Sequence, residues 1–178
     1  MNTLSPMADS TTTSPKAERM RSTALNFCRS FGAGLSGPEC LDKFFTPNPK
    51  IVEHGPHWAN ERLPFLARTF TGRRHGQPRE EDGTTTSTCD DYYDLLTSTL
   101  ALVPGTVTIP SKHDVAADPD HGIVTVPLQA KFKSVKTGKA WLEKFVYVLS
   151  DFDEEGKIGY QQLWADPLSA WLAVGDGD

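Results

Sequence analysis

The sequence predicts an α+β fold with an antiparallel sheet, and three observations support this class. Apolar residues recur at three- and four-residue intervals near the N-terminus, which is typical of amphipathic helices. Apolar and polar residues alternate along Ile123–Ser134, which is typical of a strand with one buried face. The polar turn at residues 153–156 lies between two further β-rich segments and indicates a hairpin. Helices followed by a run of strands favour the α+β class.

The composition is that of an ordinary globular protein. The chain has 178 residues, of which 38% are hydrophobic, and a formal net charge of −5. This length favours one domain, residues 19–178, after a Ser/Thr/Pro-rich tail, residues 1–18, that we expect to be disordered. The negative charge argues against nucleic-acid binding. No apolar run approaches the ~20 residues of a membrane span, and no signal peptide is visible, so we expect a cytoplasmic protein without membrane contact.

Two helices are expected in the first part of the domain. The first carries its apolar stripe over residues 20–31 and should end at residues 32–34, Gly-Ala-Gly, because glycine is typical of helix C-termini. A short second helix follows at residues 38–45, with Ser36 or Gly37 as its cap, and Pro47 should stop it. Three cysteines at scattered spacings suggest neither a disulfide framework nor a zinc site.

The rest of the chain is expected to be mostly strands. A short strand covers residues 50–54, and a third helix, capped by Asp90, covers residues 90–102. Between them, the polar residues 73–88 have no periodicity and form a long loop. The remaining expected elements are strands at residues 123–134, 139–150 and 157–165 and a last helix at residues 168–174.

Two local motifs resemble the NTF2-like superfamily. The hairpin Phe152-Asp-Glu-Glu-Gly-Lys-Ile158, closed by Leu163-Trp-Ala-Asp-Pro167, is similar to its C-terminal hairpin. Leu41-Asp-Lys-Phe-Phe45, followed by Lys50-Ile-Val-Glu-His54, is similar to its second helix and first strand. The resemblance covers roughly residues 19–175. It is strongest to the SnoaL-like proteins of fungal natural-product pathways, which are related to ketosteroid isomerase and scytalone dehydratase.

This resemblance implies both an architecture and an activity. The architecture is a cone, in which a curved antiparallel sheet wraps around the N-terminal helices and encloses a central pocket. The activity is that of an isomerase, cyclase or dehydratase that moves protons on a small hydrophobic natural-product intermediate, derived from a polyketide or a terpenoid. The resemblance also implies that no cofactor or metal is needed and that the chain forms a homodimer.

The resemblance points first to His54 as the proton carrier. In ketosteroid isomerase-like relatives the first strand ends in Val-Glu-Asp-Pro, and the matching residues here are Val52-Glu53-His54-Gly55. An imidazole with an unperturbed pKa of ~6.5 can take and return a proton near neutral pH. The alternative is that His54 caps the strand end. His57 is expected nearby as a second catalytic group, but no third ligand accompanies these histidines, so a metal site is not expected.

Other residues are expected to orient or enclose the substrate. Gln161 would orient a carbonyl or hydroxyl group, because its amide offers two donors and one acceptor. Phe27 and Val148 match the positions of two oxyanion donors in the isomerase, but neither side chain has a donor, which argues against the same isomerase mechanism. The expected substrate-binding residues are Phe27, Phe45, Glu53, Trp58, Tyr92, Lys144 and Val148. Of the adjacent tyrosines, Tyr93 is expected in the core.

The side of residues 139–150 that faces the pocket is left open by the sequence. In one arrangement Lys144, Val146 and Val148 face inward, together with Gln161, Leu163 and Ala165 on the next strand. In the other, Trp141, Glu143, Phe145 and Tyr147 face inward, together with Tyr160, Gln162 and Trp164. We favour the first arrangement, because the aromatic side chains would then form the outer face through which the chain dimerises.

Two other functions are compatible with the resemblance. A non-catalytic ligand-binding or dimerisation module would have a collapsed or wholly apolar pocket, whereas an enzyme would have two or more polar groups that converge in an apolar one. A dehydratase of the scytalone type would need His113 to face inward with His54, beside Tyr92 or Tyr147. No motif for a serine or cysteine nucleophile is present.

Overall fold

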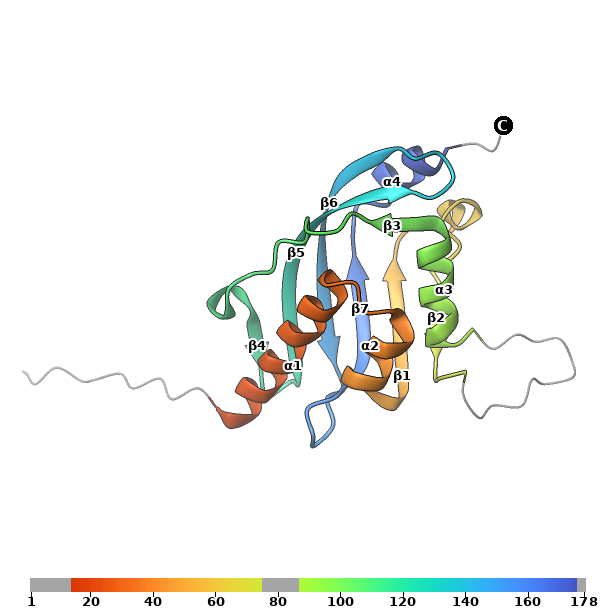
Figure 1. Ribbon diagram of the computed structural model, residues 1–178. Helices are drawn as coiled ribbons and strands as arrows, with labels where there is room; N and C mark the ends of the chain where they lie inside the picture. The colour runs from red at the N-terminus through yellow and green to blue at the C-terminus, as the bar shows by residue number, and fades with distance from the viewer. Residues whose placement is uncertain (1–13, 75–86, 176–178) are drawn as a thin grey trace, which may run out of the picture.

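The computed structural model describes residues 14–74 and 87–175, and in these ranges α-helices cover one side of a curved sheet (Figure 1). The helical elements are α1 (Pro15–Gly32), α2 (Gly37–Phe44), η1 (His57–Glu61), α3 (Cys89–Thr99), η2 (Lys112–Asp114) and α4 (Pro167–Val174). The strands are β1 (Phe45–His54), β2 (Thr69–Thr71), β3 (Leu100–Leu102), β4 (Ala116–Asp118), β5 (Ile123–Ser134), β6 (Ala140–Ser150) and β7 (Ile158–Trp164). Helices α1, α2 and α3 lie in front of the sheet, and α4 lies over one end (Figure 1).

The sheet confirms the α+β class and differs from the expectation in one respect. Its order is β2-β1-β7-β6-β5-β3, and β4 pairs with β5. All pairs are antiparallel except β1 with β7, which are parallel, so the sheet is mixed. The parallel pair arises because the chain leaves β1, builds the rest of the sheet and returns beside β1 at its C-terminal end. This return brings the first and last strands of the domain together.

The capping residues explain where the second and third helices begin. Ser36 and Glu39 form a capping box at α2, and Thr88 and Asp91 form one at α3. Thr88, not Asp90, is therefore the N-cap of α3. Asp90 instead lies in the first turn, where both of its carboxylate oxygens accept hydrogen bonds from Arg73 at 3.0 and 3.1 Å. This bidentate ion pair fixes the chain after β2 to the start of α3.

Two element boundaries differ from the sequence prediction. Strand β1 begins at Phe45 and includes Pro47. Pro47 was expected to end the second helix, and the strand was expected to begin only at residue 50. The pairing of β1 with β7 shifts register between Phe45 and Lys50, and such an irregularity tolerates proline in a strand. Residues 100–102 were expected to extend α3, but they form β3, because they pair with the end of β5. Pairing with a distant strand here overrides the local helix pattern.

Neither predicted arrangement combined the correct inner face of β6 with the correct inner face of β7. The pairs Tyr147 with Leu163 and Val148 with Gln162 show that residues of the same parity on the two strands share a face. Trp141, Glu143, Phe145 and Tyr147 face inward together with Gln161 and Leu163, whereas Lys144, Val146 and Val148 face outward. Each of the two arrangements considered above had one strand right, because the length of the turn between β6 and β7 was misjudged by one residue.

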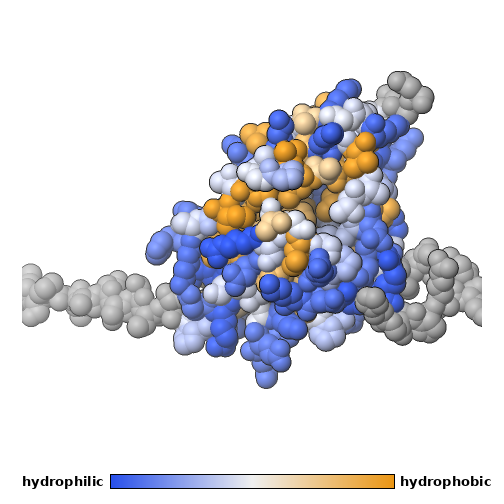
Figure 2. Space-filling view, viewed as in Figure 1, coloured by the Kyte–Doolittle hydropathy of each residue, from blue (hydrophilic) through white to orange (hydrophobic). Residues whose placement is uncertain are grey.

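The core lies between the helices and the inner face of the sheet. Phe27 of α1 is fully buried, and its ring meets Phe44, Phe45 and Tyr147 edge-on at centroid distances of 6.1, 5.3 and 5.4 Å. On the face shown in Figure 2, hydrophobic residues gather in the upper half, whereas hydrophilic residues dominate the lower half. None of the helices in the described ranges has the length and apolar character needed to cross a membrane.

The domain begins earlier than the sequence suggested. Helix α1 starts at Pro15, inside the segment expected to be disordered, and Ala17 is buried. Residues 1–13 and most of the predicted loop, residues 75–86, lie outside the described residues. Residues 15–18, which were expected to belong to the tail, therefore form the first turn of α1.

The close contact between α2 and α3 gives a first prediction. A Cβ at Gly37 would lie 2.2 Å from Cγ of the buried Tyr93. Gly37→Ala should therefore destabilise the fold by about 3 kcal/mol, which lowers the melting temperature by roughly 6–12 °C. Circular dichroism during heating measures this change.

Gly34→Ala is the matched control for the packing effect, because a Cβ at this position would meet no atom within 4 Å. The φ of +89° at Gly34 means that this variant suffers backbone strain but no steric clash. It should cost about 1 kcal/mol. Equal melting temperatures for the two variants would contradict the packing argument.

Candidate active site

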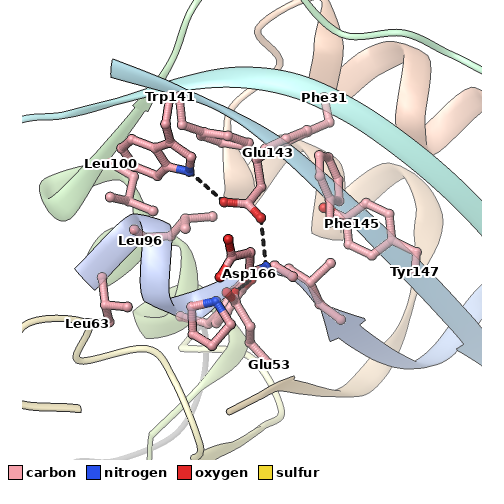
Figure 3. Close-up of a pocket in the computed structure, with 16 residues that line it drawn as sticks. Phe31, Glu53, Leu63, Leu96, Leu100, Trp141, Glu143, Phe145, Tyr147 and Asp166 are labelled. Carbon is pink, nitrogen blue, oxygen red and sulfur yellow. Dashed lines mark hydrogen bonds between the residues drawn. The ribbon is translucent and has the colours of Figure 1, made fainter. Parts of the chain in front are cut away.

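An enclosed cavity lies between the inner face of the sheet, α3 and α4 (Figure 3). The space open to a water-sized sphere is about 40 Å³, enough for roughly two or three waters. Most of the wall is apolar and aromatic, and the carboxyl groups of Glu53, Glu143 and Asp166 belong to it. The lining residues are Phe31, Glu53, Leu63, Tyr92, Leu96, Leu100, Phe132, Trp141, Glu143, Phe145, Tyr147, Leu163, Ala165, Asp166, Pro167 and Ala170.

Glu143 is fixed by two hydrogen bonds, one to each carboxylate oxygen. The indole Nε1–H of Trp141 donates to Oε2 at 2.5 Å, and the backbone N–H of Asp166 donates to Oε1 at 2.7 Å (Figure 3). Burial raises the pKa of Glu143, while these two donors act in the opposite direction by stabilising the carboxylate. The side chain of Asp166 accepts hydrogen bonds from the first turn of α4, so Glu143 is tied to the start of that helix.

Glu53 enters the cavity from β1 and has one side-chain partner in the described chain. Its carboxyl group is buried, with 6% of the residue exposed, and its Oε2 accepts a hydrogen bond of 2.8 Å from the hydroxyl of Tyr92. Burial raises its pKa to about 7, the Tyr92 bond lowers it in part, and the nearby charge of Glu143 raises it further. A carboxyl group with this pKa can both donate and accept a proton near neutral pH.

The two glutamates come from different strands and face one cavity (Figure 3). Among the described residues that line it, there is no lysine, arginine or histidine. Two negative charges in such a place repel each other and lack the solvation of water. The charge of Glu143 accordingly contributes to the raised pKa of Glu53, and carboxyl groups with different proton affinities can serve as one acid and one base.

A second polar pair is buried deeper in the core. The Tyr93 hydroxyl donates to Oε1 of Gln161 at 3.4 Å, and both side chains are buried. Within the described ranges, Nε2 of Gln161 is buried without a hydrogen-bond partner. Gln161 therefore faces inward, as predicted, but it lies outside the cavity lining. Tyr93 is buried in the core, as expected. Tyr92 is buried as well, and its side chain lines the cavity.

The structure places the predicted histidines outside the cavity. His54 lies on the outer face of β1, where its ring stacks on Trp164 at 4.1 Å and its Nε2 lies 3.0 Å from Oε1 of Gln162. The neighbouring Glu53 faces inward instead, because successive strand residues point to opposite faces. His57 is exposed in η1. The expected position of these histidines in the pocket is therefore wrong.

The other predicted binding residues divide into four groups. Glu53 and Tyr92 line the cavity. Phe27 and Phe45 are buried in the core and do not reach it, and Trp58 is exposed and packs against Trp171 of α4. Lys144 and Val148 lie on the outer face of β6, so the prediction that they face the pocket is wrong. Trp141 and Glu143, which also line the cavity, faced inward only in the arrangement that was not favoured, although a single glutamate in an alternating row of aromatic residues is a visible signal.

Two other kinds of chemistry find no support in the described ranges. The three cysteines are buried, and burial raises the pKa of the Cys28 thiol to about 12, so none is poised as a thiolate nucleophile. In the part of the chain that the structure describes, no three His, Cys, Asp or Glu side chains are grouped to hold a metal ion. What the cavity offers is carboxyl chemistry between apolar walls.

The comparisons with known proteins concern the fold. No protein-family model matches the chain, and no curated protein matches its sequence. A candidate SnoaL-like polyketide cyclase from Jannaschia sp. is 13% identical, with 93% of this chain and 97% of that chain covered and a TM-score of 0.59. An NTF2-like protein from Burkholderia xenovorans is 12% identical, with 89% and 97% covered and a TM-score of 0.58.

A third similar structure is the epoxide hydrolase/cyclase-like enzyme SalBIII, described with a role in pyran ring formation in the polyether salinomycin. It is 15% identical, with 83% of this chain and 91% of that chain covered and a TM-score of 0.54. Together these structures show that the chain has the NTF2-like fold of the SnoaL-like proteins. The fold implied by the local sequence motifs is thus confirmed.

The buried carboxyl group of Glu53 predicts a specific dependence of stability on pH. Its pKa is about 7 in the folded chain and ordinarily 4.5, so between these values the folded state binds more protons than the unfolded state. The contribution of Glu53 to the free energy of unfolding is therefore greatest below pH ~4.5 and falls as the pH rises to ~7. In Glu53→Gln this decline, roughly 3 kcal/mol, should be absent.

Urea denaturation of both proteins at several pH values from about 4 to 8 measures the difference. Glutamine keeps an oxygen that can accept the Tyr92 hydrogen bond, so packing is preserved. Parallel pH profiles for the two proteins would show that Glu53 has an ordinary pKa.

Proposed function

We propose that this NTF2-like chain is a proton-transfer enzyme, an isomerase or cyclase, that uses Glu53 and Glu143 as an acid and base pair. The observation that carries the proposal is the convergence of these two buried carboxyl groups on one apolar cavity. Carboxyl groups whose environments differ are a common way to obtain an acid and a base at one pH. The proposal replaces histidine with glutamate as the proton carrier.

The different hydrogen bonds assign different roles to the two glutamates. Glu53 accepts one hydrogen bond, from Tyr92, and has a pKa of about 7, so it holds a proton at neutral pH in a large fraction of molecules. Glu143 accepts hydrogen bonds at both oxygens, from Trp141 and Asp166, and these donors stabilise its ionised form. Glu53 is the general acid and Glu143 the general base. Tyr92 and Trp141 act through them as positioning residues.

The apolar wall indicates a small hydrophobic substrate. Aromatic rings and leucine side chains surround the two carboxyl groups, and such walls bind apolar ligands while a few polar groups set their orientation. Two of the similar structures carry cyclase names, one of them a polyketide cyclase, which agrees with a polyketide-derived intermediate. The volume of about 40 Å³ is smaller than such a ligand, so binding requires the cavity to widen.

The rival functions fit the geometry less well. The small volume favours a non-catalytic module, but two converging carboxyl groups are the feature expected of an enzyme. A dehydratase of the scytalone type needs two histidines in the pocket. His113 is exposed in η2 and His54 lies on the outer face, so that arrangement is not formed.

We also propose that the chain forms a homodimer through the outer face of the sheet. Trp141, Phe145 and Tyr147 face inward, so of the five aromatic residues expected on this face only Tyr160 and Trp164 lie on it. Trp164 is 43% exposed and borders a groove of about 530 Å³ that Pro127 and Val146 also line. An exposed tryptophan at an apolar groove is a common centre of protein interfaces.

Sedimentation equilibrium tests this dimer. At micromolar concentration, the molecular mass measured for the wild type should be twice that of the monomer. Trp164→Glu should sediment as a folded monomer, because a charge at the centre of an interface is desolvated without a partner. A wild type that sediments as a monomer contradicts the proposal.

Removing the proposed acid gives the test of the catalytic function. Glu53→Gln should lower turnover roughly 10²–10⁴-fold, the usual contribution of a general acid–base group. Product formation is followed by mass spectrometry on a panel of hydrophobic ketones and epoxides, with circular dichroism as the folding control. His54→Ala is the matched comparison, since it removes an ionisable group from the same strand but from the opposite face. If His54→Ala lost activity and Glu53→Gln kept it, the assignment would fail.

A further inference from the structure

The cavity wall combines aromatic rings with acidic groups, and none of the described residues that line it is cationic. Six aromatic residues line it, from α1, α3, β5 and β6: Phe31, Tyr92, Phe132, Trp141, Phe145 and Tyr147. The rings are arranged mostly edge-to-face with one another, as for Phe145 and Tyr147, whose ring planes meet at 90°. Glu53 and Glu143 are buried among these rings, and Asp166 lies at the start of α4. Every formal charge on the wall is thus negative.

The hydrogen-bond donors of the wall are already engaged by these carboxyl groups. The hydroxyl of Tyr92 donates to Glu53, and the indole N–H of Trp141 and the backbone N–H of Asp166 donate to Glu143. These three donors are therefore not directed at a substrate oxygen. A site that stabilises a negative oxygen needs donors aimed at it, and here the donors hold carboxylates instead. The potential that a ligand meets is negative.

We propose that this cavity recognises positive charge: it binds hydrophobic molecules with a protonated amine and excludes those with a carboxylate. A cation gains from the carboxylates and from the faces of the aromatic rings, and both attractions are strengthened when water is excluded. A carboxylate meets repulsion from Glu53 and Glu143 and finds no cationic partner on the wall. If the proton-transfer function proposed above holds, a neutral substrate that accepts a proton from Glu53 gains positive charge in this cavity.

Three five-membered ring compounds of similar shape test this inference. Pyrrolidine is protonated near pH 8, cyclopentanol is neutral, and cyclopentanecarboxylate is an anion. Their binding is followed by the NMR shift of the indole N–H of Trp141, assigned with Trp141→Phe. The exposed Trp58 and Trp164 report non-specific binding in the same spectra. Pyrrolidinium should bind at least roughly tenfold more tightly than the carboxylate, with the alcohol between them.

Charge-removing variants show whether the glutamates cause this preference. In Glu53→Gln the preference for pyrrolidinium should fall severalfold, and in Glu143→Gln it should fall as well. Glu154→Gln is the matched control, because Glu154 is exposed in the turn between β6 and β7 and is not among the residues that line the cavity. It should leave the preference unchanged. Using both cavity variants guards against a folding defect in one of them.

The inference is overturned by any of three results: no shift of Trp141 with pyrrolidinium at its highest usable concentration, equal or tighter binding of the carboxylate, or a preference that both cavity variants retain. These results are separate from the activity test. Loss of turnover in Glu53→Gln without an amine preference would keep the proposed enzyme and remove this inference. An amine preference in a protein without turnover would do the reverse.

Discussion

The burial of Glu53 and Glu143 in one apolar cavity is the constraint on which the site depends. Each carboxyl group loses the solvation of water, and the pair repels when both are ionised. The fold offsets this cost with aimed donors: Tyr92 for Glu53, and Trp141 and the backbone of Asp166 for Glu143. Because these donors come from α3, β6 and the segment before α4, the arrangement exists only when these elements are assembled. The carboxyl pair and the architecture thus depend on each other.

The sheet brings the two glutamates together through its strand order. Glu53 lies on β1 and Glu143 on β6, and β7 is placed between these strands. Its parallel pairing with β1 sets Glu53 beside Leu163, while its antiparallel pairing with β6 sets Leu163 beside Tyr147. The side chains of these four residues face one side of the sheet. A shift of one residue in either pairing would turn a glutamate outward, since strand faces alternate.

Helix α4 closes the cavity and also takes part in its chemistry. Pro167 and Ala170 form part of the wall, and Asp166 both caps the helix and donates its backbone N–H to Glu143. A displacement of α4 that moves Asp166 would therefore stretch a hydrogen bond to Glu143. The position of α4 thus both limits the cavity and anchors Glu143.

The sequence by itself determined the α+β class, the α-helices and the longer strands β1, β5, β6 and β7 of the described chain, and the resemblance to NTF2-like proteins, because local periodicity and turn residues carry that information. It also identified Glu53 and Tyr92 as lining residues. Only the tertiary structure decided that Glu53 and not His54 faces the cavity, and that Glu143 joins it. The face that each strand turns inward depends on pairing between distant segments. An error of one residue in the turn between β6 and β7 exchanges the two faces of a strand, and local sequence does not fix that register.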